Sequence, residues 1–181
     1  MGYARDGGTW TSDYSGVTWV SSTRTRMGSS PFSGSSCPTY NKTTAQLQSA
    51  GYIDGTGNLV AKYDAATAHL GAPWRMPTAD EFDALVSNCT TAWTTHNGVY
   101  GRLVTGKGAF STKSIFLPAA GLGYDSDLNN PGSDGYYWSS TPSSDDSNDA
   151  WYLGFGSDDF DRSIFSRYGG FPVCPLRGFA K

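Results

Sequence analysis

The last third of the chain lacks five residue types that the earlier part uses. From Ser114 to Ala180 there is no Lys, Glu, Gln, Met or His, and the whole chain holds a single glutamate, Glu81. All-β proteins with loops rich in Gly and Ser are themselves poor in Lys and Glu. The depletion therefore identifies no function by itself.

Motifs for metal binding and for covalent catalysis are also missing. The three cysteines, Cys37, Cys89 and Cys174, form no C-x-x-C pair, and His69 and His96 form no H-x-x-x-H pair. There is no Gly-x-Ser-x-Gly elbow that would present a serine nucleophile. We therefore expect no catalytic residue, no metal and no cofactor, and a protein that is not an enzyme.

The charge and the apolar runs exclude two further classes of partner. A net charge of -3 and a pI near 5.2 disfavour nucleic acid, which needs a basic surface to neutralise phosphates. No apolar run approaches the roughly 20 residues of a membrane span. The first residues lack the apolar core of a secretory signal. The protein is thus expected to reach its site without such a signal, or to be a piece of a longer chain.

The clearest local pattern is a helix from about Thr78 to Asn88. Thr78 and Glu81 form a capping box, in which each side chain satisfies a backbone N–H at the helix start. The apolar residues of this segment recur at helical spacing and predict a buried face. They are Phe82, Leu85, Val86 and Cys89.

Weaker patterns predict two more short helices and several strands. One helix is expected from Thr43 to Ala50 before Gly51, and another between an N-cap at Asp64 and Gly71. Short strands are expected around 102–104, 114–117 and 152–155. The 23 Gly and 9 Pro favour a loop-rich domain over a helical one, and the length suits one domain.

Several phrases occur in an order that resembles a known family. Asp64-Ala65-Ala66, then Gly71, then Trp74-Arg75-Met76-Pro77-Thr78 before a helix, resembles the Fibrobacter succinogenes major paralogous domain. The resemblance covers roughly residues 60–178. Later pieces that agree are Asn88 to Thr95, Val104 to Gly106, Ser114 to Gly121, Tyr137 to Thr141, Ala150 to Phe155, and Val173 to Arg177.

The resemblance implies a fold and a division of the chain. Members of that group have a C-type-lectin-like fold, so we expect an α+β domain with a small twisted, mostly antiparallel sheet, one or two helices and long loops. Residues 60–181 would form the lectin-like core, with a variable ligand-binding region at about 136–178. Residues 1–59 would be the N-terminal part of the same domain. Trp74 and Trp138 are expected in its core.

The resemblance also implies a function. Proteins with this frame are similar to the variable proteins of diversity-generating retroelements, in which adenines of C-terminal codons are rewritten. Rewritten AAC or AAT codons yield Tyr, Asp, Ser, Gly, Phe or Arg among others, but never Lys, Glu, Gln, Met or Trp. The same small palette serves antibody paratopes. We therefore expect recognition of a protein or glycan target on a cell surface, by a phage tail-tip receptor-binding protein or a bacterial surface-display protein outside the cytoplasm; the oligomeric state is open.

By this analogy the C-terminal region divides into a fixed frame and a ligand-facing set. The frame would be Trp138, Ser139, Ser140, Ala150, Leu153, Phe155, Arg167, Gly170, Val173 and Pro175. The candidate ligand-binding residues are Tyr136, Thr141, Ser143, Asp145, Tyr152, Gly154, Asp158, Asp159, Phe160, Asp161, Arg162, Phe165, Tyr168, Gly169 and Phe171.

Three alternatives stay open. Cys174 stands where the family more often has Arg, so it is either an exposed variable residue or the disulfide partner of Cys89. The chain could instead be an oxidase relative of formylglycine-generating enzymes with Cys174 as the reactive thiol, or a purely structural surface protein. The aspartates near 145–149 and 158–161 are interpreted as solvated loop acids, because the motifs of calcium-dependent sugar binding are absent.

Overall fold

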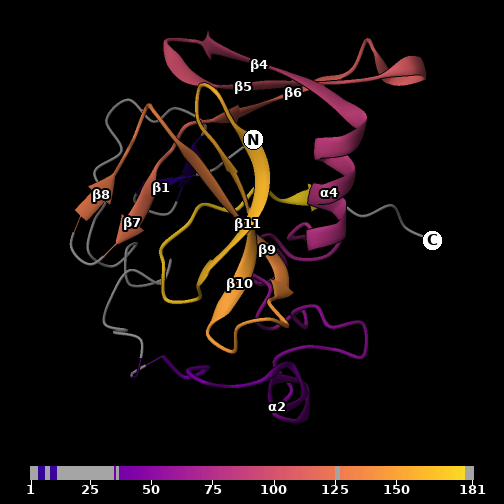
Figure 1. Ribbon diagram of the computed structural model, residues 1–181, viewed down its shortest axis with the longest axis vertical. Coiled ribbons are helices and arrows are strands. Elements are labelled where there is room, and N and C mark those ends of the chain that lie inside the picture. The colour runs from indigo at the N-terminus through magenta and orange to yellow at the C-terminus, as the bar shows by residue number, and fades with distance from the viewer. Residues whose placement is uncertain (1–3, 7–8, 12–34, 36, 125–126, 178–181) are drawn as a thin grey trace.

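A computed structural model describes residues 4–6, 9–11, 35, 37–124 and 127–177 (Figure 1). Over these residues the chain is mostly β, with five small antiparallel sheets and three short α-helices. The two three-stranded sheets have the orders β4-β5-β6 and β11-β10-β9. The strands are β1 (Ala4–Asp6), β2 (Thr9–Thr11), β3 (Trp74–Arg75), β4 (Cys89–His96), β5 (Val99–Gly106), β6 (Ser114–Pro118), β7 (Leu122–Tyr124), β8 (Asp127–Asn129), β9 (Gly135–Pro142), β10 (Asp149–Phe155), β11 (Phe160–Ser166) and β12 (Leu176–Arg177).

The prediction of a C-type-lectin-like α+β fold is wrong. The described chain is dominated by strands that are distributed over several small sheets, whereas one small sheet with helices was expected. The phrases that carried the resemblance contain helix caps and turns, which specify local backbone structure. Such signals do not determine how strands far apart in the chain assemble, so they could not specify the fold.

The three predicted helices are confirmed at nearly the predicted bounds. They are α2 (Thr44–Ser49), α3 (Ala65–Leu70) and α4 (Ala79–Asn88), with capping boxes before α2 and α4. Gly71 follows α3 with a φ of 74°, a left-handed conformation that favours glycine. A short 3-10 helix, η2 (Gly108–Phe110), follows β5.

Helix α4 lies against the sheet β9-β10-β11 and contributes to the main core. In Figure 1 this helix stands beside the central strands, with the sheet β4-β5-β6 across one end of the molecule. Phe82 is buried in the core, and Leu85, Val86 and Cys89 pack against the core cluster as the helical spacing predicted. The other core residues come from strands, the loop after β6 and the segment before β12, and are Val104, Leu117, Ala119, Tyr137, Leu153, Phe155 and Cys174.

The strands after α4 are longer than the sequence patterns indicated. β4 and β5 pair along eight residues each and are joined by Asn97-Gly98, with φ values of 50° and 80°. A two-residue turn of this kind suits the twist of a β-hairpin. The Asn97-Gly98 dipeptide is therefore a local hairpin signal.

Two arginines hold distant segments together through backbone carbonyls. Arg102 on β5 is buried, and its guanidinium donates to the carbonyl oxygens of Gly156 (3.0 Å), Ser157 (2.8 Å) and Asp159 (2.9 Å). The guanidinium of Arg167 donates to carbonyls of residues 39, 42, 147 and 148. Burial lowers the pKa of Arg167 from its usual value.

We expect Glu81→Gln to destabilise the protein only above acidic pH. Glu81 accepts from the Arg75 guanidinium (2.6 Å to Nη1), and this bond lowers the pKa of the carboxyl below its usual value. A lowered folded-state pKa gives stability above the unfolded-state pKa, and this stability is lost as pH falls through the folded value. Glutamine keeps the capping role, so the cost at pH 7 is under about 1 kcal/mol, as for an exposed ion pair.

Urea unfolding of both proteins at neutral pH and near pH 3 measures this difference. The two stabilities should converge at the lower pH. A gap that is unchanged by pH would mean that the carboxylate charge does not contribute.

Candidate functional site

The sheet β9-β10-β11 has an inner face toward α4 and an outer face away from it. In the strand register Tyr152 lies opposite both Trp138 and Ser163, and Gly154 lies opposite both Tyr136 and Asp161. Residues paired in this way project to the same side of a sheet. We call this side the outer face; the residues on it are Tyr136, Trp138, Tyr152, Gly154, Asp161, Ser163 and Phe165.

The intervening residues form the inner face. Leu153 lies opposite Tyr137, and both are fully buried. The Tyr137 and Phe155 rings stack with centroids 5.9 Å apart, and Tyr137 also donates to the carbonyl of Pro118 (2.7 Å). The Phe155 ring also occupies the space where a Cβ on Gly135 would lie, which excludes any larger residue there.

An aromatic cluster is centred on Phe171, which is 2% exposed and rests on the outer face. Its ring stacks on Trp138 at 4.2 Å between centroids. The rings of Tyr152, Phe165 and Tyr136 surround it at 5.0, 5.1 and 5.2 Å. Tyr124 extends the cluster by contacts with Phe165 (6.4 Å) and Tyr168 (6.1 Å). The cluster therefore joins β7, β9, β10, β11 and the loop 167–173.

The rim of this cluster is open to solvent while its centre is not. Tyr124 is 43% exposed, and Tyr136, Tyr152, Phe165 and Tyr168 are half-buried. Half-exposed tyrosines around a packed centre can present large apolar area with a polar tip at low entropic cost. This arrangement suits a binding surface.

Three residues predicted to face a ligand, Phe171, Gly169 and Ser143, are instead buried. Phe171 is the centre of the cluster, and Gly169 packs under it, with its carbonyl accepting from the Trp138 indole N–H (3.1 Å). Trp138 is more exposed than predicted, because it lies half-buried on the outer face and not in the core. Trp74, also predicted in the core, is half-buried in β3. The stacked rings of Trp138 and Phe171 form the packed centre against which the other aromatic rings of the outer face lie.

Phe160 and Arg162 lie on the inner face, so the outer-face site does not include them. The Phe160 ring is 6.0 Å from that of Phe155. The Arg162 guanidinium lies 3.8 Å from the centre of the Trp151 ring and pairs with Asp83 of α4 (2.8 Å). Strand alternation places both toward the helix, because they are one residue out of phase with Asp161 and Ser163.

Thr141, Ser143 and Asp145 lie beyond the other end of the outer face. Thr141 Oγ1 donates to Asn58 Oδ1 (2.5 Å) and accepts from the backbone N–H of Ala79 (3.0 Å). Ser143 is buried, and its hydroxyl accepts from the backbone N–H of Asp145 (3.1 Å). These side chains serve local structure, while the Asp145 residue is exposed in the loop after β9.

The turn between β10 and β11 presents Asp158 and Asp159 to solvent. Asp159 Oδ1 accepts from the Gly156 backbone N–H (2.9 Å). Asp161 is exposed at the start of β11, beside Gly154. On the neighbouring strand, burial and then the negative charge of Asp134 raise the pKa of the Tyr136 hydroxyl, against a hydrogen bond to Asn130 that lowers it. This end of the outer face is therefore acidic.

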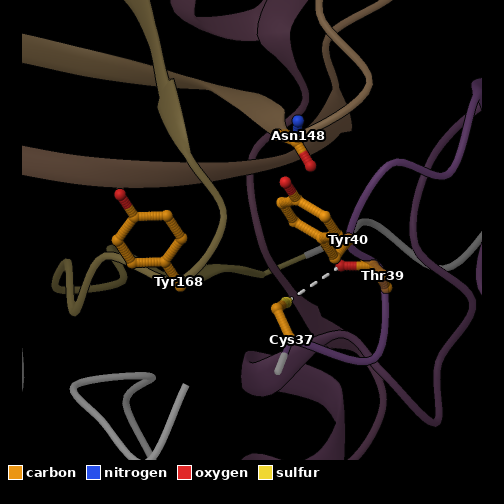
Figure 2. A pocket seen from close by; sticks show the side chains of 5 residues that line it. All are labelled: Cys37, Thr39, Tyr40, Asn148 and Tyr168. Carbon is orange, nitrogen blue, oxygen red and sulfur yellow. Dashed lines mark hydrogen bonds between the residues drawn. The ribbon is translucent and has the colours of Figure 1, made fainter. Parts of the chain in front are cut away.

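A small pocket lies beside the cluster, between Tyr168 and the segment before α2. Figure 2 shows its lining by Cys37, Thr39, Tyr40, Asn148 and Tyr168, with a contact of 3.3 Å between Cys37 Sγ and Thr39 Oγ1. Its cavity volume of ≈ 10 Å³ accommodates about one water molecule. The pocket is too small for a ligand. It lies where the segment before α2 meets the loop before β10, and there the Asn41 backbone N–H donates to Asn148 Oδ1 (2.7 Å).

The cysteines and acids form no reactive or metal-binding group in the described part of the chain. Cys37, Cys89 and Cys174 are not in disulfides, and Cys174 is buried in the core. No group of three or more His, Cys, Asp or Glu side chains among the described residues could hold a metal ion. No described helix is long and apolar enough to cross a membrane.

Sequence reasoning missed three members of the site, Trp138, Ser163 and Tyr124. Trp138 follows Tyr136 at a spacing of two, so strand alternation could have placed it on the same face. Tyr124 had no local signal, because it reaches the cluster through the pairing of Gly123 with Gly170, which lie far apart in the chain.

Comparison with known proteins identifies one partial similarity. A family model described as a domain of unknown function (DUF8237) matches residues 93–167, which extend from β4 to the loop after β11. No curated protein and no solved structure matches the chain. The matched region includes the whole outer face and Tyr124, but not Tyr168 or Phe171.

Proposed function

We propose that the protein binds a macromolecular or cell-surface target through the outer face and the rim of its aromatic cluster. One observation carries the proposal. Five residues predicted from the sequence to face a ligand, Tyr136, Tyr152, Gly154, Asp161 and Phe165, lie on one side of a sheet whose opposite side is core, and a sixth, Tyr168, contacts Tyr124 at the rim of the cluster. Exposed aromatics of this kind dominate the energetics of interfaces.

We further propose that this face is diversified, as in variable proteins of retroelements. Every outer-face residue except Trp138 belongs to the set that rewriting of AAC or AAT codons produces, and Trp138 supports Phe171 from within. Alternation along β10 would then separate codons that are free to change from codons that maintain the core. Such a protein would act outside the cytoplasm, on a bacterial surface or a phage particle.

The surrounding DNA tests the diversification directly. We expect a nearby reverse transcriptase gene and an invariant repeat matching codons of residues 136–178, with adenines at the codons of the outer face. A repeat with adenines at the codons of Leu153 or Phe155 would contradict the proposal, since changes there would damage the core.

Tyr152→Ala tests the binding face once a target has been found by probing a library of bacterial and host surface molecules. Loss of a central aromatic contact should weaken binding by about 2 kcal/mol, roughly 30-fold. Tyr63→Ala is the matched control, because Tyr63 is 39% exposed and lies before α3, outside the outer face. Titration by surface plasmon resonance measures both. Equal losses for the two variants would reject the outer face as the site.

We propose that the protein is not an enzyme. An oxidase reading needs Cys174 as an accessible thiolate, yet Cys174 is 7% exposed within the core cluster. A thiol-labelling time course under native conditions tests this, because rapid alkylation of Cys174 would show an accessible thiolate and would favour the oxidase hypothesis.

A purely structural role would make the outer face a self-assembly contact. Sedimentation at rising protein concentration would detect such self-association.

A further inference from the structure

Negative charge is concentrated in the part of the chain that builds the outer face. Between Ser114 and Asp161 there are nine aspartates and no Lys or Arg, although the whole chain has 13 basic and 16 acidic residues. The nine are Asp125, Asp127, Asp134, Asp145, Asp146, Asp149, Asp158, Asp159 and Asp161. The overall charge of -3 does not reveal that the negative charges are concentrated in this segment and the positive charges lie outside it.

The fold brings four of these carboxylates to one end of the outer face. Asp161 lies in the same row as Gly154 and Tyr136, and Asp134 accepts from the Tyr136 hydroxyl (3.4 Å). A Cβ placed on Gly156 would lie 2.8 Å from Asp159 Oδ1 and 3.1 Å from Asp134 Oδ1, so these two carboxylates converge on the same point. Asp158 is exposed beside them.

No basic side chain in the described part of the chain forms a salt bridge with these four carboxylates. The ion pairs found there are Arg75–Glu81 and Arg162–Asp83. Arg102 is buried beneath the turn and donates to backbone carbonyls, while Arg162 points to the inner face. These carboxylates, which lie beside half-exposed tyrosines, are therefore able to form salt bridges with a positively charged partner.

From this combination we infer that the outer face takes a positively charged protein segment, whose Arg or Lys side chains lie on the tyrosine rings and pair with the carboxylates. The inference rests on the proposed function and adds the chemistry of the partner. Arginine over an aromatic ring beside a carboxylate is a favourable arrangement. The inner face already contains one, in which Arg162 lies on Trp151 and pairs with Asp83.

Charge complementarity distinguishes this occupant from the alternatives. A nucleic acid or an acidic peptide would be repelled by the four carboxylates. A neutral glycan could stack on the tyrosines and donate its hydroxyls to the carboxylates, but it would leave their negative charge uncompensated. A basic segment uses both features of the face at once.

Fluorescence anisotropy with defined peptides tests the inference. The probe is a labelled peptide of four Arg-Gly-Ser repeats, and its control has citrulline at every Arg, which keeps the shape and removes the charge. We expect the Arg peptide to bind at least about 10-fold more tightly, and to weaken between about 0.05 M and about 0.3 M salt. A neutral oligosaccharide serves as a competitor.

Variants then separate the face from the net charge. Asp161→Asn should weaken binding of the Arg peptide about 3-fold or more, and asparagine can still accept from the Arg162 backbone N–H as Asp161 does (2.7 Å). Asp80→Asn is the matched control. Asp80 is exposed in α4, so this substitution removes the same charge at a place outside the outer face. Thermal melts of both variants monitor folding.

Equal effects of Asp161→Asn and Asp80→Asn would overturn the inference, because binding would then follow net charge alone. Equal binding of the citrulline peptide would also overturn it, and so would an absence of binding by the Arg peptide or its displacement by the neutral oligosaccharide. These failures leave the proposed function intact if Tyr152→Ala still weakens binding to a library-selected target. Loss of the Tyr152 effect would reject the proposed function itself.

Discussion

Leu153→Ala should destabilise the protein by about 2–5 kcal/mol, whereas Tyr152→Ala, one residue earlier, should cost far less. Leu153 is 0% exposed and lies in the core cluster, so truncation leaves a cavity that the neighbours fill only in part. Tyr152 is half-buried on the other side of the same strand. Water can therefore fill part of the space that its truncation leaves. The pair compares the two faces of β10 at nearly the same place in the chain.

Denaturant unfolding of the two variants beside the parent protein measures the difference. Phe155→Ala is a second core variant, and Tyr168→Ala a second rim variant, for the same comparison. If Tyr152→Ala loses as much stability as Leu153→Ala, the outer face is a second core, and its interpretation as a binding surface is wrong.

Arg102→Met should cost about 3 kcal/mol or more. Methionine replaces the stem of the side chain but leaves the carbonyls of Gly156, Ser157 and Asp159 without the guanidinium that now donates to them. Leaving buried polar groups unsatisfied costs about 1–3 kcal/mol each, and water can reach some of these carbonyls at the turn. The turn that carries Asp158 and Asp159 should also become more mobile.

Arg75→Met is the matched control for Arg102→Met. Arg75 forms a salt bridge with Glu81 on the surface, where the pair is worth at most about 1 kcal/mol. Urea unfolding gives the two free energies, and hydrogen exchange at residues 156–161 reports the turn. Similar costs for the two substitutions would show that Arg102 does not stabilise the turn.

The helices could be predicted from the sequence because their signals are local. The capping box of Thr78 and Glu81 and the N-cap at Asp64 act within three residues, and the structure has both. The fold could not be predicted in the same way. Its sheets depend on pairings such as β3 with β12, whose strands are only two residues long and carry no pattern of their own.

The candidate site was predictable as a set of residue types but not as a surface. The alternation in β10 separates Tyr152 from Leu153 and needs no structure to detect. The burial of Phe171 and the exposure of Tyr124 depend instead on contacts between β7 and the loop after β11. Phe160 and Arg162 were placed on the ligand side because the prediction grouped neighbours in sequence and did not follow the strand period of two.

The pairing of β3 with β12 also constrains when the protein can fold during its synthesis. Trp74 and Arg75 pair with Arg177 and Leu176, and the segment at residues 39–42 is held by Arg167. At about 5–20 residues per second, a ribosome needs roughly 5–20 s to make the intervening chain of about 100 residues. Throughout that interval the partners of β3 and of the segment before α2 do not yet exist. Completion of the domain is therefore expected to occur after translation of its last strand, and not progressively from the N-terminus.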